Sequence, residues 1–264
     1  MPLSTLAFTA SHFLVDINAY LERIGYSGSL APTAESLRAL QVAHLRAVPF
    51  ENLSIHANEP IVLEEEALFT KIVRRRRGGF CYEANGLFAA LLRELGFDVV
   101  MLSAEVANAS GEFSPPFDHM TLLVTLEQRW LVDVGFGDLF LEPLLLDDRS
   151  EQVQVNRAYR IVPDGPSFIL MQRIEGEEWN PQYRFTLQPH QFADYEEMCR
   201  YHQTSPQSHF TQGRICTRVT EDRRITLSEM RLITTTKDGG RQERTLNSEE
   251  EYAAILREHF GVVM

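Results

Sequence analysis

The chain has 264 residues, of which 44% are hydrophobic and 23% are charged, an ordinary composition for a soluble globular protein. A formal net charge of −12 argues against general binding to nucleic acids or to anionic membranes, and no apolar run reaches the length of about 18 to 20 residues that a membrane span requires. Three widely spaced cysteines, and a beginning without a basic segment or an A-x-A cleavage site, favour a reducing, cytoplasmic location.

Helical patterns dominate the first part of the chain. We expect four helices there, over residues 16–24, 33–48, 64–74 and 81–96. In the fourth, leucine and phenylalanine recur at helical spacing, and Gly96 suits a C-terminal stop. The first 96 residues are therefore predicted to be mostly helical.

From residue 98 the pattern changes to runs rich in valine, leucine and threonine, which are typical of strands. Strands are expected over residues 99–106, 119–126, 130–134, 159–162, 168–173, 183–187, 214–220 and 225–235, with helices over 192–201 and 248–259. Helices followed by strands and then a small mixed segment predict an α+β fold rather than a parallel α/β sheet.

Cys81 is a candidate nucleophile. Gly78 and Gly79 allow a sharp turn before it, and Cys81 opens the predicted fourth helix. The positive end of a helix favours thiolate over thiol. The alternative is that Cys81 is a small buried hydrophobic residue, as most free cysteines are.

His119 and Asp133 follow on two predicted strands. A cysteine at a helix start, followed by a histidine and a carboxylate, is the order that a Cys-His-Asp triad needs. Asp133 stands among apolar strand residues, where an unpaired carboxylate is disfavoured. The three residues lack the closely spaced ligand pairs typical of zinc sites, so we expect no metal.

Spacing alone does not establish this triad. If residues 127–129 form a simple turn, Asp133 lies opposite Leu123 instead of His119. That offset of four residues is about 13 Å along a strand. A bulge or an irregular turn would have to close this distance.

Several motifs together resemble the arylamine N-acetyltransferase family. They are Arg77-Gly-Gly-Phe-Cys-Tyr-Glu83, Pro49-Phe-Glu-Asn-Leu53, His119-Met120, Asp133-Val-Gly-Phe-Gly137, Tyr20–Tyr26 and Ser205–Phe210. The resemblance implies a helical bundle over residues 1–96, an antiparallel β-barrel-like domain over 97–202 and a small α/β lid over 203–264. It also implies a core similar to that of papain-like and transglutaminase-like cysteine enzymes.

The same resemblance implies a ping-pong reaction in which acetyl-CoA acylates Cys81 and an arylamine, arylhydroxylamine or hydrazine then takes the acetyl group. His119 and Asp133 match the other two triad residues. Acceptor-binding aromatic positions match Phe50, Phe136 and Phe210, and CoA contacts are implied at Gly135, Gly137 and Ser208. Arg77 matches a structural residue that bonds near Glu51 and Asn52. We expect a monomer or homodimer whose partners are small molecules only.

One departure and three alternatives remain open. Asp118 stands where many members carry a small neutral or hydroxyl residue, and its charge would disfavour anionic phosphates and raise the histidine pKa. The same triad would also serve an amide synthase of macrolide assembly, or a thioester hydrolase that uses water as acceptor. A degenerate binding or scaffold protein is the non-enzymatic alternative.

Overall fold

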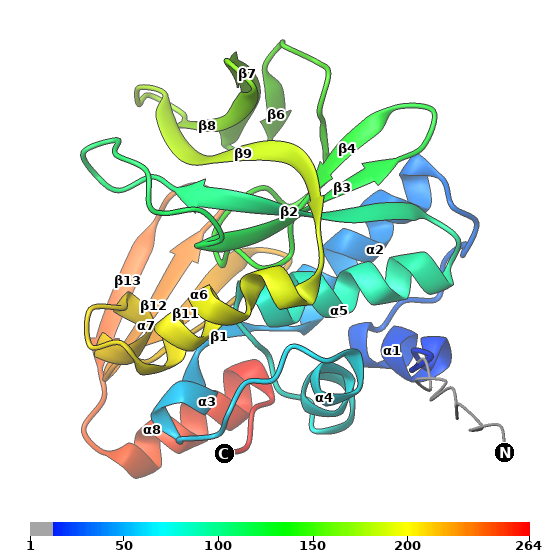
Figure 1. Ribbon diagram of the computed structural model, residues 1–264. Helices are drawn as coiled ribbons and strands as arrows, with labels where there is room; N and C mark the ends of the chain where they lie inside the picture. The colour runs from blue at the N-terminus through cyan, green and yellow to red at the C-terminus, as the bar shows by residue number, and fades with distance from the viewer. Residues whose placement is uncertain (1–12) are drawn as a thin grey trace, which may run out of the picture.

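A computed structural model describes residues 13–264; the first twelve residues of the predicted helical bundle lie outside them. The helical first part is confirmed (Figure 1). Its helices are α1 (Ile17–Ile24), α2 (Ala34–Ala47), α3 (Leu53–His56), α4 (Glu65–Phe69) with the π-helical turn η1 (Thr70–Arg74), and α5 (Cys81–Glu94). Asp16 and Thr33 cap α1 and α2 by accepting hydrogen bonds from backbone N–H groups.

The middle of the chain forms an antiparallel sheet of eight strands in the order β5-β4-β3-β2-β9-β8-β7-β6. Its strands are β2 (Asp98–Val106), β3 (His119–Thr125), β4 (Arg129–Val132), β5 (Leu144–Leu145), β6 (Gln152–Gln154), β7 (Arg157–Asp164), β8 (Ser167–Ile174) and β9 (Asn180–His190). The sheet curls until its two edges meet, where the Gln152 side chain bonds the backbone N–H and carbonyl of Leu145. Side-chain amides thus satisfy edge groups that would otherwise lack partners, and the barrel is almost closed.

The last part of the chain carries helices and a second, five-stranded sheet in the order β1-β10-β11-β12-β13. Its elements are α6 (Phe192–Thr204), α7 (His209–Gln212), β10 (Ile215–Val219), β11 (Arg223–Ser228), β12 (Arg231–Thr236), β13 (Arg241–Thr245), α8 (Glu249–Ile255) and η2 (Leu256–Phe260). Strand β1 (Phe50–Glu51) pairs with β10, so the lid sheet includes a strand from the helical part. The domain boundaries at residues 96 and 202 stay a prediction.

The structure corrects the expected strands in the last part of the chain. The single strand predicted over 225–235 is a hairpin, because Glu229 adopts a φ of 49° and turns the chain between β11 and β12. Strand β13 was missed, because all five of its residues are exposed and polar and carry no alternating apolar signal.

Helix α5 is the centre of the molecule. Every residue from Cys81 to Leu92 is buried, as expected for a helix surrounded on all sides. It packs against β2 and β3 on one side and against α4 and α6 on others (Figure 1). Within residues 13–264, no helix is both long and apolar enough to cross a membrane.

Candidate active site

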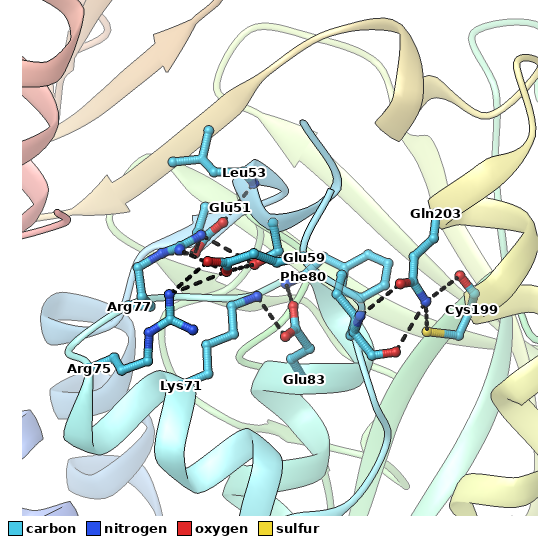
Figure 2. A network of polar contacts seen from close by, with 12 residues as sticks. Glu51, Leu53, Glu59, Lys71, Arg75, Arg77, Phe80, Glu83, Cys199 and Gln203 are labelled. Carbon is cyan, nitrogen blue, oxygen red and sulfur yellow. Dashed lines mark hydrogen bonds and ion pairs between the residues drawn. The ribbon is translucent and has the colours of Figure 1, made fainter. Parts of the chain in front are cut away.

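The turn before α5 is held by two buried ion pairs. Arg77 is fully buried, and its Nη2 lies 2.9 Å from Glu51 Oε1. Lys71 Nζ lies 2.6 Å from Glu83 Oε1, while the other Glu83 oxygen accepts the backbone N–H of Phe80 at 3.2 Å. Figure 2 shows Arg77 pointing toward Glu51 and Lys71 pointing toward Glu83. The prediction that Arg77 bonds beside residues 51–52 is confirmed.

Gly78 allows the turn to approach the segment that contains β1. A Cβ at this position would lie 1.9 Å from the carbonyl oxygen of Pro49, which no side chain tolerates. The close approach lets the backbone of Glu51 donate to the Gly79 carbonyl at 3.0 Å. The two glycines therefore position the start of α5 against β1.

His119 and Asp133 are in direct contact. His119 is the first residue of β3, Asp133 follows the last residue of β4, and His119 Nε2 lies 2.7 Å from Asp133 Oδ2. Both side chains are buried. Since a carboxylate only accepts hydrogen bonds, Nε2 is the protonated ring nitrogen and Nδ1 is the basic one.

The expected register of these strands was wrong by two residues. Leu122 pairs with Val132, so continuing this register brings Asp133 beside Thr121 instead of Leu123. The remaining offset from His119 is two residues, about 7 Å along a strand. Asp133 lies beyond the paired part of β4, and its side chain closes this distance without a bulge.

Asn85 connects the carboxylate to the cysteine helix. It lies one helical turn after Cys81, and its amide nitrogen donates to Asp133 Oδ1 at 2.9 Å and to the Met120 carbonyl at 2.6 Å. Its amide oxygen accepts the Val134 N–H at 2.8 Å. The sequence reasoning missed this residue, although a buried amide at the i+4 position from a nucleophile is a usable signal.

Cys81 lies close to the residues that follow His119 and Asp133 in the chain. Gly135 packs so closely on the start of α5 that an added Cβ would lie 2.7 Å from Cys81 Cα. The Cys81 thiol also receives a hydrogen bond from the backbone of Met120, the residue after His119. The structure therefore brings the three predicted triad residues into one buried cluster.

The environment of Cys81 differs from the expectation that the start of a helix favours its thiolate form. Burial raises the pKa of the Cys81 thiol well above its ordinary value, the Met120 hydrogen bond opposes this, and the negative charges of Asp118 and Asp133 add to the increase. The helix end alone does not make a thiolate. Ionisation of this thiol near neutral pH therefore needs a base that takes its proton.

Aromatic rings surround this cluster on two sides. The Phe136 ring lies 5.2 Å from the His119 ring, and Phe210 lies 6.2 Å from Phe50 and 5.4 Å from Phe80. All three phenylalanines predicted to contact the acceptor are partly exposed, which suits a wall for a flat apolar group.

A cavity of about 130 Å³ opens between the barrel and the lid sheet, with Asp133 and Phe136 in its lining. Basic side chains of Arg157, Arg224 and Lys237 also line it. The two arginines share one carboxylate: Arg157 lies 2.7 Å and Arg224 2.9 Å from Asp138. Positive charge therefore exceeds negative charge there, despite the acidic chain.

The three residues predicted to contact CoA lie in different settings. Gly137 lines the cavity. The Gly135 N–H donates to Asp133 Oδ1 at 2.9 Å, and the buried Ser208 bonds His202 at 3.0 Å and accepts the Phe210 N–H. Among residues 13–264, no group of histidine, cysteine and carboxylate side chains has the arrangement of a metal site.

Comparison with known proteins agrees with this arrangement. A family model described as N-acetyltransferase matches residues 33–264. The chain is 37% identical to the arylamine N-acetyltransferase of Mycolicibacterium smegmatis, over 94% of this chain and 92% of that protein. It is 32% identical to proansamycin X synthase of Amycolatopsis mediterranei, over 91% of this chain and 95% of that one. The structure of Mycobacterium marinum arylamine N-acetyltransferase in complex with CoA superposes with a TM-score of 0.86 at 33% identity, covering 94% of this chain and 93% of that one.

The fold and the matched family model define an acyltransferase of the N-acetyltransferase class, and the predicted α+β architecture is confirmed. Within this class, the identity and coverage of its relatives place the chain in the arylamine N-acetyltransferase family.

Proposed function

We propose that this enzyme moves an acetyl group from acetyl-CoA to the nitrogen or oxygen of arylamines, arylhydroxylamines or hydrazines through a thioester on Cys81. The observation that carries the proposal is the buried contact of 2.7 Å between His119 and Asp133, joined to the cysteine helix through Asn85.

In the first half-reaction, His119 Nδ1 takes the proton of the Cys81 thiol, and the sulfur attacks the carbonyl carbon of the donor thioester. The bond between that carbon and the CoA sulfur breaks, and CoA leaves as a thiol with the proton from the imidazolium. Asp133 holds the ring in the tautomer that this transfer requires and stabilises the imidazolium.

In the second half-reaction, the acceptor nitrogen attacks the acetyl carbon on Cys81 and gives its proton to His119. The carbon–sulfur bond then breaks, and the cysteine sulfur regains a proton from the ring. Phe136 and the pair of Phe50 and Phe210 supply apolar walls for an aromatic acceptor.

The basic cavity supports binding of the donor's phosphates. Arg157, Arg224 and Lys237 lie beside Gly137 in its lining, so guanidinium groups and one ammonium group offer charge-assisted hydrogen bonds to phosphate oxygens. We assign the phosphate contacts to these cations rather than to Gly135 and Ser208, whose polar groups already have partners in the protein.

Intact-protein mass spectrometry after mixing with acetyl-CoA, without acceptor, tests the proposal. We expect one acetyl group per chain on Cys81 and none in Cys81→Ser, with Cys199→Ser as the matched control that still acylates. The absence of an acyl-enzyme, or its persistence in Cys81→Ser, would refute the mechanism. Propionyl-CoA and malonyl-CoA in the same experiment define the range of donors.

A second candidate function is amide formation on a polyketide chain, favoured by the similarity to proansamycin X synthase. CoA release distinguishes the candidates. Release that depends on an added arylamine supports the acetyltransferase, whereas release at the same rate in water alone supports a hydrolase. Failure of acetyl-CoA to acylate, with acylation by a longer thioester, supports the synthase.

A further inference from the structure

A second pair of a histidine and a carboxylate, one buried and one half-buried, lies beside the proposed nucleophile. Asp118, the residue before His119, has its Oδ1 3.2 Å from Nε2 of His202 on α6. The His202 side chain is 6% exposed and that of Asp118 is 21% exposed. The structure gives Asp118 a partner from a distant part of the chain.

The backbone before Asp118 is held in an uncommon conformation. Phe117 has a φ of 67°, which is rare for a bulky residue and needs support from its surroundings. Its N–H donates to Ser103 Oγ at 2.8 Å, and its carbonyl accepts from the Tyr82 hydroxyl at 2.6 Å. Contacts from β2 and α5 thus fix the position of Asp118.

Both ring nitrogens of His202 face oxygen atoms. Nδ1 lies 3.0 Å from Ser208 Oγ, and Nε2 lies 3.2 Å from the Asp118 carboxylate. Within the part of the chain that the structure describes, Nε2 has no aligned hydrogen bond, so its contact with Asp118 depends on charge. An imidazolium carries a proton on each nitrogen, so it can face the Asp118 carboxylate through Nε2 and donate to Ser208 Oγ through Nδ1.

The groups that face Asp118 come from three elements. His202 belongs to α6, His119 to β3, and Cys81 with the Tyr82 phenol to α5. Burial favours the protonated acid, but the close contacts with His202 and Ser114 and the charge of the nearby histidines hold the pKa of Asp118 below its ordinary value. Asp118 is therefore a carboxylate at neutral pH.

This carboxylate opposes the chemistry at the thiol, because its charge raises the pKa of Cys81. It also disfavours the approach of an anionic donor. A positive charge at 3.2 Å cancels most of this effect, because opposite charges so close together form a dipole whose field falls off steeply.

We propose that protonated His202 is the counter-ion of Asp118, and that it acts as a positioning residue which keeps the charge beside Cys81 balanced so that the thiolate can form. The inference rests on the proposed role of Cys81 as nucleophile. It assigns to His202 an electrostatic role through Asp118, without contact with either substrate.

The test is the pH dependence of iodoacetamide alkylation at Cys81, measured by peptide mass spectrometry in the full chain. Raising the pKa of the thiol by one unit lowers its thiolate fraction about tenfold at any pH well below that pKa. We expect the pKa of Cys81 to change by about one unit. His202→Gln should move the alkylation midpoint to higher pH, and Asp118→Asn in the same chain should return it. His259→Gln, which removes a more exposed histidine beside Glu258, is the control and should have no effect.

An unchanged midpoint in His202→Gln, or a shift that Asp118→Asn does not reverse, would overturn the inference. If His202→Gln does not fold, the imidazole nitrogen shifts of ¹⁵N-histidine-labelled wild-type protein decide the matter. We expect His202 to be charged at pH 7 and to become neutral in Asp118→Asn, and a neutral ring in the wild type would overturn the inference. Because alkylation needs no acyl donor, failure here leaves acylation by acetyl-CoA, and with it the proposed function, separately testable.

Discussion

Replacement of Asp133 by asparagine tests how the triad depends on hydrogen-bond direction. Asp133 accepts three hydrogen bonds: one from His119 at 2.7 Å, one from Asn85 at 2.9 Å and one from the Gly135 N–H at 2.9 Å. All three partners donate, and an asparagine has only one oxygen. Its oxygen will face the two donors that share Oδ1, so its NH₂ group will face His119.

The consequence for His119 is a change of tautomer. Facing a donor, Nε2 must accept, so the ring proton moves to Nδ1, which can then no longer take the proton of Cys81. The equivalent substitution in serine-protease triads lowers kcat by about 10⁴, or about 5.5 kcal/mol of transition-state stabilisation. We expect a loss of about 10³ to 10⁴ in the rate of acylation by acetyl-CoA at pH 7.

Rapid-quench mass spectrometry of the acyl-enzyme measures this rate. The deficit should shrink at alkaline pH, where the thiol ionises without a base. Since burial raises the pKa of Cys81, this recovery begins above the ordinary range of a cysteine. Asp147→Asn, at an exposed pair with Arg129, is the matched control. Acylation by Asp133→Asn within tenfold of the wild-type rate at pH 7 would refute the assigned role.

Three further substitutions test the supporting contacts. Asn85→Ala removes three buried hydrogen bonds, so we expect a loss of about 2–4 kcal/mol in urea unfolding together with slower acylation; normal acylation would exclude a role in holding the carboxylate. Arg77→Ala leaves Glu51 buried and unpaired and should lower the free energy of unfolding by about 3–5 kcal/mol. Its control, Arg75→Ala at an exposed pair, should lower it by under about 1 kcal/mol. Arg224→Gln should raise KM for acetyl-CoA about tenfold, with a smaller effect at high salt, and leave acylation at saturating donor intact; an unchanged KM would place the phosphates elsewhere.

Periodicity predicted the parts of the fold in which one face of an element is buried. The helices that begin at Ile17, Ala34 and Cys81 and the barrel strands β2, β3, β4, β7, β8 and β9 follow such patterns and lie near their expected positions, whereas the short barrel strands β5 and β6 were not predicted. The hairpin at Glu229 could not be predicted in this way, because a residue with positive φ replaced the usual glycine or asparagine. The polar edge strand β13 lacks a buried face and therefore any periodic signal.

For the candidate site, residue order predicted more than residue spacing. The order of Cys81, His119 and Asp133 indicated a triad, but the register that brings two of them together depends on where the strands pair, which the turn sequence left open. The charge environment of the Cys81 thiol could also not be predicted from the sequence. Burial and the two carboxylates at residues 118 and 133 outweigh the helix end at the thiol, and the partners of those carboxylates lie on other elements.

The ion pairs around the turn before α5 explain how the buried Cys81 is held in place. Burying a pair such as Arg77 and Glu51 stabilises the fold little, because desolvation offsets the attraction, but separating its members leaves a costly unpaired charge. A displacement of the turn would separate both this pair and that of Lys71 with Glu83, which also holds the N–H before Cys81. The pairs therefore resist small movements more strongly than apolar packing of the same residues would. Because a misplacement of about 1 Å at a reacting atom can reduce a rate about 100-fold, we expect this stiffness to support the proposed acyl transfer.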